Sequence, residues 1–198
     1  IQGVGGLDQV NQKFINTLKK VSKKHNTCII ADEVQSGFYR TGDFFAFEKF
    51  NFKPDVITMA KGMGNGFPIG GILINPKIKA KHGLLGTTFG GNHLACSASL
   101  SVLEILEKID LKNKIIELEK YFRKKAKKIS SIKKIKGRGL MLGLEFQYEV
   151  KELRKKLILE EKIFTGGSSN RNLIRILPPL TIEKKHIDLF FDSLKKIT

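Results

Sequence analysis

The sequence has no tryptophan, two cysteines and four histidines, and these scarcities exclude several classes of protein. Cys28 and Cys96 are too far apart in the chain to suggest a disulfide-stapled scaffold, and neither has a partner at metal-ligand spacing. The histidines show no such spacing either, so we expect no metal site. We expect both thiols to be free and buried, as in a protein of the reducing cytoplasm.

Long apolar runs are also missing. None approaches the ~18–20 residues that would cross a bilayer, and the glycine-rich first segment has no secretory pattern. We therefore expect a cytoplasmic protein with no membrane partner. The chain begins at Ile1 rather than at a methionine, and we interpret it as a piece of a longer protein.

Acidic residues are few, 19 against 36 basic ones, and the net charge of +17 raises the possibility of nucleic-acid binding. The excess is nearly all lysine, spread along amphipathic segments. Base-reading modules favour arginine and interleaved aromatic residues, and no such cluster occurs. We therefore interpret the lysines as a solvated surface and expect no nucleic-acid partner, while a basic nucleic-acid-binding module stays an alternative.

The pattern of apolar residues in the first half predicts an α/β fold with a mostly parallel sheet. Short apolar runs typical of buried strands cover residues 27–31, 55–59 and 71–74. Helical spacing predicts helices over residues 8–25, with Asp8 as the N-cap, and 93–109.

The second half predicts a smaller α+β unit, and we place the domain boundary near residue 110. The expected helices are 112–130, 151–160 and 183–196, and the expected strands are 139–147, a short one near Ile163, and 173–177. The two predicted domains are therefore residues 1–110 and 111–198.

Two acids end the first predicted strand, in Cys28–Glu33. Ligands of open α/β sheets bind at the carboxyl ends of strands, so an acid there points into a site. A nucleotide hydrolase uses the same pattern, here Asp32 and Glu33, to hold magnesium. That alternative also needs a Gly-x-x-x-x-Gly-Lys-Ser/Thr loop, which this sequence does not contain.

A lysine ends the second predicted strand, in Asp55–Gly62. Burying Lys61 is unfavourable unless it has a special role. A Schiff base with an aldehyde is such a role, because it removes the charge. Gly62, Gly64 and Gly66 would let a cofactor approach the backbone closely. The alternative is a lysine that extends its amine out of the strand end into solvent.

Together these segments resemble the class III aminotransferases of pyridoxal-phosphate (PLP) fold type I, nearest to the acetylornithine and succinylornithine branch. The segments that carry the resemblance are Asp32–Gly37, Lys61–Gly62, Thr87–Asn92, Lys136–Gly143 and Leu173–Leu180. It covers essentially the whole chain, which matches the C-terminal half of the family. Residues 1–110 would then be the C-terminal part of the large PLP-binding domain, and 111–198 the small C-terminal domain.

The resemblance implies a role for five residues around the cofactor. Asp32 would bind the pyridine nitrogen and keep it protonated, Val34 would pack on the ring, and Gln35 would bind the phenolic oxygen. Lys61 would form the Schiff base with PLP and later shuttle the proton. Thr88 would reach the PLP phosphate of a neighbouring subunit, which implies a homodimer with a shared active site.

The resemblance also implies a substrate site. Arg175 would hold a substrate carboxylate through a bidentate contact. Many relatives have a glutamate where this chain has Val4, and that glutamate can neutralise the arginine when an ω-amino substrate enters. Val4 cannot do so, which leaves open how Arg175 is handled between the two half-reactions.

The activity expected from the resemblance is transfer of the terminal amine of N-acetylornithine, or N-succinylornithine, to 2-oxoglutarate in arginine biosynthesis. Another class III ω-aminotransferase, acting on ornithine or 4-aminobutyrate, remains an alternative. The family's upstream phosphate-gripping loop is missing, so we expect the chain alone to be an inactive fragment.

Overall fold

The computed structural model describes residues 1–79, 81–83 and 86–198, and their contacts divide the chain into two compact units. The first, here called the N-terminal unit, comprises Val10–Phe38 and Asp43–Asp110. The second, here called the C-terminal unit, comprises Ile1–Gln9, Tyr39–Gly42 and Leu111–Thr198.

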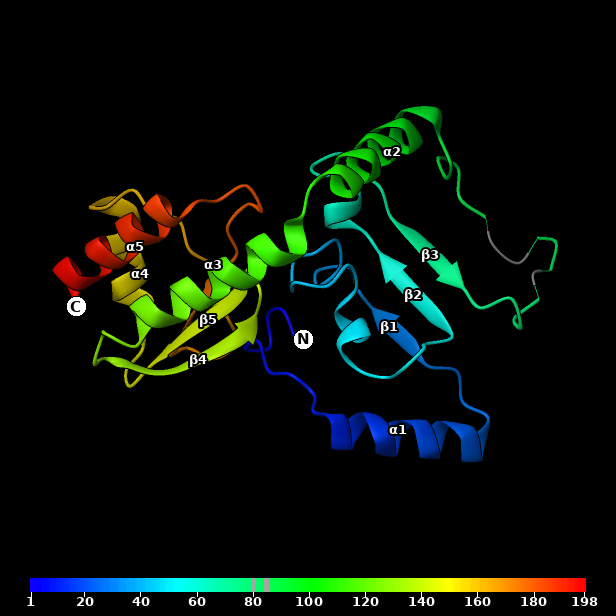
Figure 1. The fold of residues 1–198 in the computed structure, drawn as a ribbon, viewed down its shortest axis with the longest axis horizontal. Coiled ribbons are helices and arrows are strands. Elements are labelled where there is room, and N and C mark those ends of the chain that lie inside the picture. The colour runs from blue at the N-terminus through cyan, green and yellow to red at the C-terminus, as the bar shows by residue number, and fades with distance from the viewer. Residues whose placement is uncertain (80, 84–85) are drawn as a thin grey trace. The chain divides into compact units, whose positions relative to one another are not determined.

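A three-stranded sheet organises the N-terminal unit (Figure 1). Its elements are α1 (Gln12–His25), β1 (Ile30–Asp32), the 3-10 turn η1 (Ala46–Lys49), β2 (Val56–Met59), the 3-10 turn η2 (Lys61–Met63), β3 (Gly71–Ile74) and α2 (His93–Lys108). β1 and β2 are parallel, with Asp32 opposite Thr58, whereas β2 and β3 are antiparallel. The α/β class is therefore confirmed. β3, expected as one of the parallel strands, is antiparallel to β2 instead, because apolar runs look alike in both kinds of pairing.

Helix α1 begins four residues later than the pattern predicts. Asn11, not Asp8, is its N-cap, and the Asn11 side chain accepts a hydrogen bond from the Phe14 N–H at 2.8 Å. At the other end, Asn26 adopts the left-handed conformation that commonly closes a helix. The prediction of Asp8 as a cap was wrong, because that carboxylate pairs with Lys136 in the C-terminal unit.

The C-terminal unit packs helices on an antiparallel sheet of order β4-β5-β6 (Figure 1). Its elements are α3 (Leu111–Ala126), β4 (Ile132–Arg138), β5 (Met141–Phe146), α4 (Lys151–Leu159), β6 (Leu173–Ile176) and α5 (Lys184–Ile197). The sequence did not predict β4, because lysines interrupt its apolar alternation. The strand expected near Ile163 is wrong, since only Gly166 forms an isolated bridge, to Arg175.

The core of the C-terminal unit lies between its sheet and helices α3 and α5. Leu144 and Phe146 of β5 are fully buried, as is Phe191 of α5, whose ring lies 4.8 Å from that of Phe122 in α3. At the rim, Asp188 of α5 pairs with Lys125 of α3, which lowers the pKa of the Asp188 carboxyl. Apolar packing and the Asp188–Lys125 ion pair thus hold α3 and α5 together.

Two segments distant in sequence complete the C-terminal unit. Leu7 is 1% exposed and packs with Met141 and Leu173. A side chain at Gly143 would collide with it, since an added Cβ lies 2.8 Å from Leu7 Cδ1. From the other segment, the Arg40 guanidinium donates to the Pro178 carbonyl at 2.5 Å, and burial lowers the pKa of Arg40. Residues 1–9 therefore belong with the C-terminal sheet and not with α1.

The two cysteines are free, as expected, but Cys28 and Cys96 are both exposed, so their predicted burial was wrong. Cys28 precedes β1 instead of lying within it, because that strand begins only at Ile30. Within the described ranges, no helix is long and apolar enough to cross a membrane.

Candidate functional site

The carboxyl ends of β1 and β2 bring Asp32 and Lys61 to the same edge of the N-terminal sheet. Because the strands are parallel, they end on the same side, and Asp32 is the last residue of β1. Its register partner Thr58 is three residues before Lys61, a distance of at most ~10 Å along extended chain. Both side chains are therefore within reach of one small molecule at this edge.

The Asp32 carboxylate is exposed and held in place through one oxygen. Its Oδ1 accepts hydrogen bonds from the Val34 N–H at 3.1 Å and from the Thr58 hydroxyl at 3.3 Å. Oδ2 has no hydrogen-bond partner among the residues that the structure describes. The protein thus orients the carboxylate and leaves one oxygen to accept a hydrogen bond from a ligand.

Lys61 has a backbone conformation that side chains rarely adopt. Its φ is +44°, in the left-handed region. Hydrogen bonds on both sides hold this turn, from Met63 N–H to the Ala60 carbonyl at 3.0 Å and from Gly64 N–H to the Lys61 carbonyl at 3.2 Å. Such strain costs about 1–3 kcal/mol and concentrates at functional sites. No motif in the sequence signals this conformation.

The glycines after Lys61 make room for the protein's own chain. A Cβ on Gly62 would lie 2.9 Å from the Phe38 Cβ, and one on Gly64 would lie 2.2 Å from the Phe67 carbonyl oxygen. Without side chains, Gly62 and Gly64 allow the turn that carries Lys61 to pack. A Cβ on Gly66 would meet no atom within 4 Å, and the expectation that the glycines admit a cofactor stays a prediction.

Glu33, next to Asp32, is buried and committed to the protein. It is 3% exposed, and its carboxylate accepts hydrogen bonds from the Ser36 hydroxyl at 2.5 Å and from the backbone N–H groups of Ala46 and Phe47 at 3.0 and 2.9 Å. Across the described part of the chain, no cluster of three metal-ligating side chains occurs. Glu33 is therefore a structural acid, and the Asp32–Glu33 magnesium alternative loses its second ligand.

The other predicted site residues lie in three places. Val34 and Gln35 are half-buried in the turn after β1, close in sequence to Asp32. Thr88 is exposed in a turn. The residue before it, Thr87, lines an open hollow of about 640 Å³ together with Gly71 and Gly86. Arg175 is half-buried in β6 and so belongs to the C-terminal unit. The structure thus brings Asp32 and Lys61 to one sheet edge, with Val34 and Gln35 directly after Asp32 in sequence, and carries Arg175 on a separate compact unit.

Comparison with known proteins places this arrangement among transaminases. The family model described as Aminotransferase class-III matches residues 1–198. The chain is 42% identical to the acetylornithine aminotransferase of Aquifex aeolicus and 39% identical to that of Methanocaldococcus jannaschii. Each match covers 100% of this chain but 52% and 50% of the relative, so the chain spans about half the length of these curated relatives.

Solved structures agree with the sequence comparison. The ornithine aminotransferase of Toxoplasma gondii superposes with a TM-score of 0.90 at 27% identity, over 100% of this chain and 49% of that one. The acetylornithine aminotransferase of Elizabethkingia anophelis superposes with a TM-score of 0.86 at 30% identity, over 100% and 52%. The two-unit fold described above is therefore that of fold type I aminotransferases.

The structural role of Glu33 is testable by Glu33→Gln. The amide cannot accept hydrogen bonds at both of its terminal atoms, so at least one buried donor loses its partner. We expect the free energy of unfolding to fall by about 2 kcal/mol in urea titrations. Glu160→Gln, at an exposed position, is the matched control and should stay within about 0.5 kcal/mol of wild type. A magnesium-dependent gain in stability that Glu33→Gln abolishes would contradict this assignment.

Proposed function

Because this chain belongs to the class-III aminotransferase family, whose members depend on PLP, we propose that it carries the catalytic lysine and the ring-binding aspartate of a transaminase. The enzyme would move the terminal amine of N-acetylornithine to 2-oxoglutarate. The observation that carries this proposal is the parallel β1–β2 pair, which delivers Asp32 and Lys61 to one sheet edge.

The groups at this edge suit PLP. Asp32 Oδ2 would accept the hydrogen bond of the protonated pyridine nitrogen, and the Lys61 amine would bond to the aldehyde carbon. Neither group has a competing ion pair within the described ranges. Val34 would pack on the ring, Gln35 would bind its phenolic oxygen, and Thr88 would bind the phosphate. When bound, PLP supplies an electron sink for the negative charge that develops at the substrate carbon.

Each of the two central side chains has a distinct task. The Asp32 carboxylate holds a proton on the ring nitrogen, because its negative charge favours the cationic ring. The Lys61 Nζ would take the proton from the substrate carbon that bears the amine and pass it on toward the cofactor. The strained, hydrogen-bonded turn at Lys61 fixes the point from which this amine acts.

Arg175 would bind the carboxylate that amino donor and oxo-acid acceptor share. In the described part of the chain, its terminal nitrogens Nη1 and Nη2 have no hydrogen-bond or ion-pair partner. Val4, which is 59% exposed, offers no carboxylate to compete with substrate. The arginine is thus available in both half-reactions.

N-Acetylornithine is our first choice of donor because the relatives at 42% and 39% identity are named for it. Ornithine is the second candidate, since the relative from Oceanobacillus iheyensis, at 36% identity, is an ornithine aminotransferase. N-Succinylornithine and 4-aminobutyrate are the other candidate amine donors. Arginine biosynthesis in the cytoplasm is the setting we propose.

We further propose a homodimer in which Thr88 serves the partner's cofactor. Phe89, beside Thr88, is 79% exposed, and Leu94 at the start of α2 is 75% exposed. Exposed apolar side chains close in sequence to a site residue support a surface that another subunit covers.

The assignment of Lys61 predicts where the cofactor is attached. After borohydride reduction of the complete PLP-loaded enzyme, we expect mass spectrometry to find the cofactor on the peptide that contains Lys61. Lys61→Ala should lose this adduct, the visible absorbance and nearly all turnover. Lys53→Ala, at an exposed position before β2, should keep all three. An adduct on another lysine would rule out the assignment.

The assignment of Asp32 predicts a loss of rate. Asp32→Asn removes the charge that keeps the ring nitrogen protonated, so the barrier should rise by about 4 kcal/mol or more, roughly a thousandfold in kcat. Glu104→Gln, an exposed acid on α2, should leave kcat unchanged. A value of kcat within tenfold of wild type in Asp32→Asn would mean that Asp32 is not the ring partner.

The substrate proposal predicts the ranking of amine donors. With 2-oxoglutarate as acceptor, kcat/KM should be highest for N-acetylornithine, compared with N-succinylornithine, ornithine and 4-aminobutyrate. The complete enzyme should be assayed at matched donor concentrations. Equal values across this panel, or a preference for ornithine, would overturn the choice of N-acetylornithine without affecting the assignment as a transaminase.

A further inference from the structure

The turn formed by residues 166–170 lies along the Arg175 side chain. Gly166 and Arg175 exchange two backbone hydrogen bonds, each 2.9 Å long, and the Gly167 carbonyl accepts a hydrogen bond from Arg175 Nε. A Cβ on Gly166 would lie 3.1 Å from the Arg175 Cβ and 3.3 Å from its Nε. The turn therefore contacts the arginine from its base to its guanidinium.

We propose that this turn is a positioning element that presents Arg175 to substrate carboxylates. A guanidinium can bind a carboxylate side-on, through Nε and one terminal nitrogen, or end-on, through both terminal nitrogens. Here Nε is committed to Gly167, so the end-on edge is the one left for substrate. The inference rests on the proposed function, in which Arg175 binds the carboxylates of donor and acceptor.

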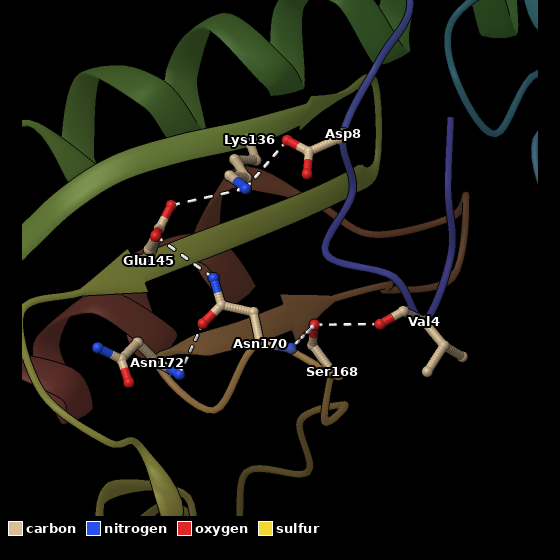
Figure 2. Close-up of polar contacts among 7 residues, drawn as sticks. All are labelled: Val4, Asp8, Lys136, Glu145, Ser168, Asn170 and Asn172. Atoms are coloured by element: carbon tan, nitrogen blue, oxygen red, sulfur yellow. Dashed lines mark hydrogen bonds and ion pairs between the residues drawn. The ribbon is translucent and has the colours of Figure 1, made fainter.

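The turn is itself fastened to the N-terminal segment through the backbone of Val4 (Figure 2). The Val4 carbonyl accepts hydrogen bonds from the Ser169 N–H at 2.9 Å and from the Ser168 hydroxyl at 3.1 Å. Figure 2 shows the Val4 carbonyl directed at Ser168. Val4 thus acts on the turn through its backbone.

Asn170 holds the other end of the turn. Its N–H donates to the Ser168 hydroxyl at 3.1 Å, and its side-chain oxygen accepts from the Asn172 N–H at 3.0 Å. Its side-chain nitrogen donates to Glu145 of β5 at 3.3 Å. The Ser168 hydroxyl is therefore a bridge between Val4 and Asn170, and its loss would remove one hydrogen bond on each side of the turn.

An ion-pair chain continues the network back to the N-terminal segment (Figure 2). Lys136 lies 3.7 Å from Glu145 and 3.0 Å from Asp8, and its side chain is mostly covered. The hydrogen bond to Asp8, followed by the attraction of both carboxylates, raises the pKa of Lys136, so the lysine stays charged. Residues 1–9 are thereby fixed at both Val4 and Asp8.

Preorganisation explains what such a network contributes. An arginine side chain loses much rotamer freedom when it binds a ligand, and a residue already held in its bound conformation avoids that cost. The gain applies equally to ground state and transition state, since the carboxylate does not react. It should therefore appear in KM and leave kcat largely unchanged.

The test compares variants of the complete PLP-loaded enzyme. Ser168→Ala removes the bridging hydroxyl, Ser168→Thr keeps it, and Gly166→Ala crowds the guanidinium. We expect Ser168→Ala and Gly166→Ala to raise KM for N-acetylornithine and 2-oxoglutarate three- to tenfold, with kcat within twofold of wild type. Ser168→Thr should stay within twofold in both. Arg175→Ala, measured in parallel, should raise both KM values further.

A reagent without a carboxylate separates positioning from a general disturbance. Hydroxylamine reacts with the lysine-bound cofactor, and its rate should be the same in wild type, Ser168→Ala and Gly166→Ala. A slowed hydroxylamine reaction in step with KM would overturn the proposal, because the turn would then be merely structural.

The roles of Arg175 and of the turn are distinguishable in these measurements. Raised KM values in Arg175→Ala with unchanged values in Ser168→Ala and Gly166→Ala would overturn the positioning role and leave the proposed function intact. Unchanged KM values in Arg175→Ala would refute the substrate-binding role of Arg175, and the positioning proposal with it.

Discussion

The parallel pairing of β1 with β2 is the constraint on which the candidate site depends. Its register sets Asp32 opposite Thr58, whose hydroxyl also binds the Asp32 carboxylate. A slip of one residue would turn the side chains of β1 to the other face of the sheet. Both the place and the orientation of Asp32 relative to the turn at Lys61 therefore follow from one short ladder of backbone hydrogen bonds.

Two adjacent acids show how strongly such local geometry divides chemical roles. Asp32 and Glu33 differ by one methylene, but successive side chains of an extended chain point in opposite directions. Asp32 faces solvent at the sheet edge, while Glu33 is buried among backbone N–H donors around η1. An acid proposed to bind a ligand must keep an oxygen free, as Asp32 does among the described residues, whereas Glu33 uses both oxygens within the protein.

The C-terminal unit shows a second kind of dependence, on segments far apart in sequence. Residues 1–9 pack Leu7 against its sheet, and residues 39–42 bring the Arg40 guanidinium to the Pro178 carbonyl. The N-terminal segment also fastens the turn that lies along Arg175. The arginine on β6 that we propose binds substrate is thus supported by residues more than 160 positions away.

Several features were determined by the sequence alone. The apolar runs and helical periodicities predicted most elements to within a few residues, because these signals are local, and they placed Lys61 just after a strand. Other features depended on contacts that no local pattern encodes. The antiparallel direction of β3, the burial of Glu33 and the pairing of Asp8 with Lys136 each require a partner distant in the chain. The positive φ of Lys61 and the contacts of the turn at residues 166–170 with Arg175 also belong here. Packing and hydrogen bonds maintain both only once the fold is complete.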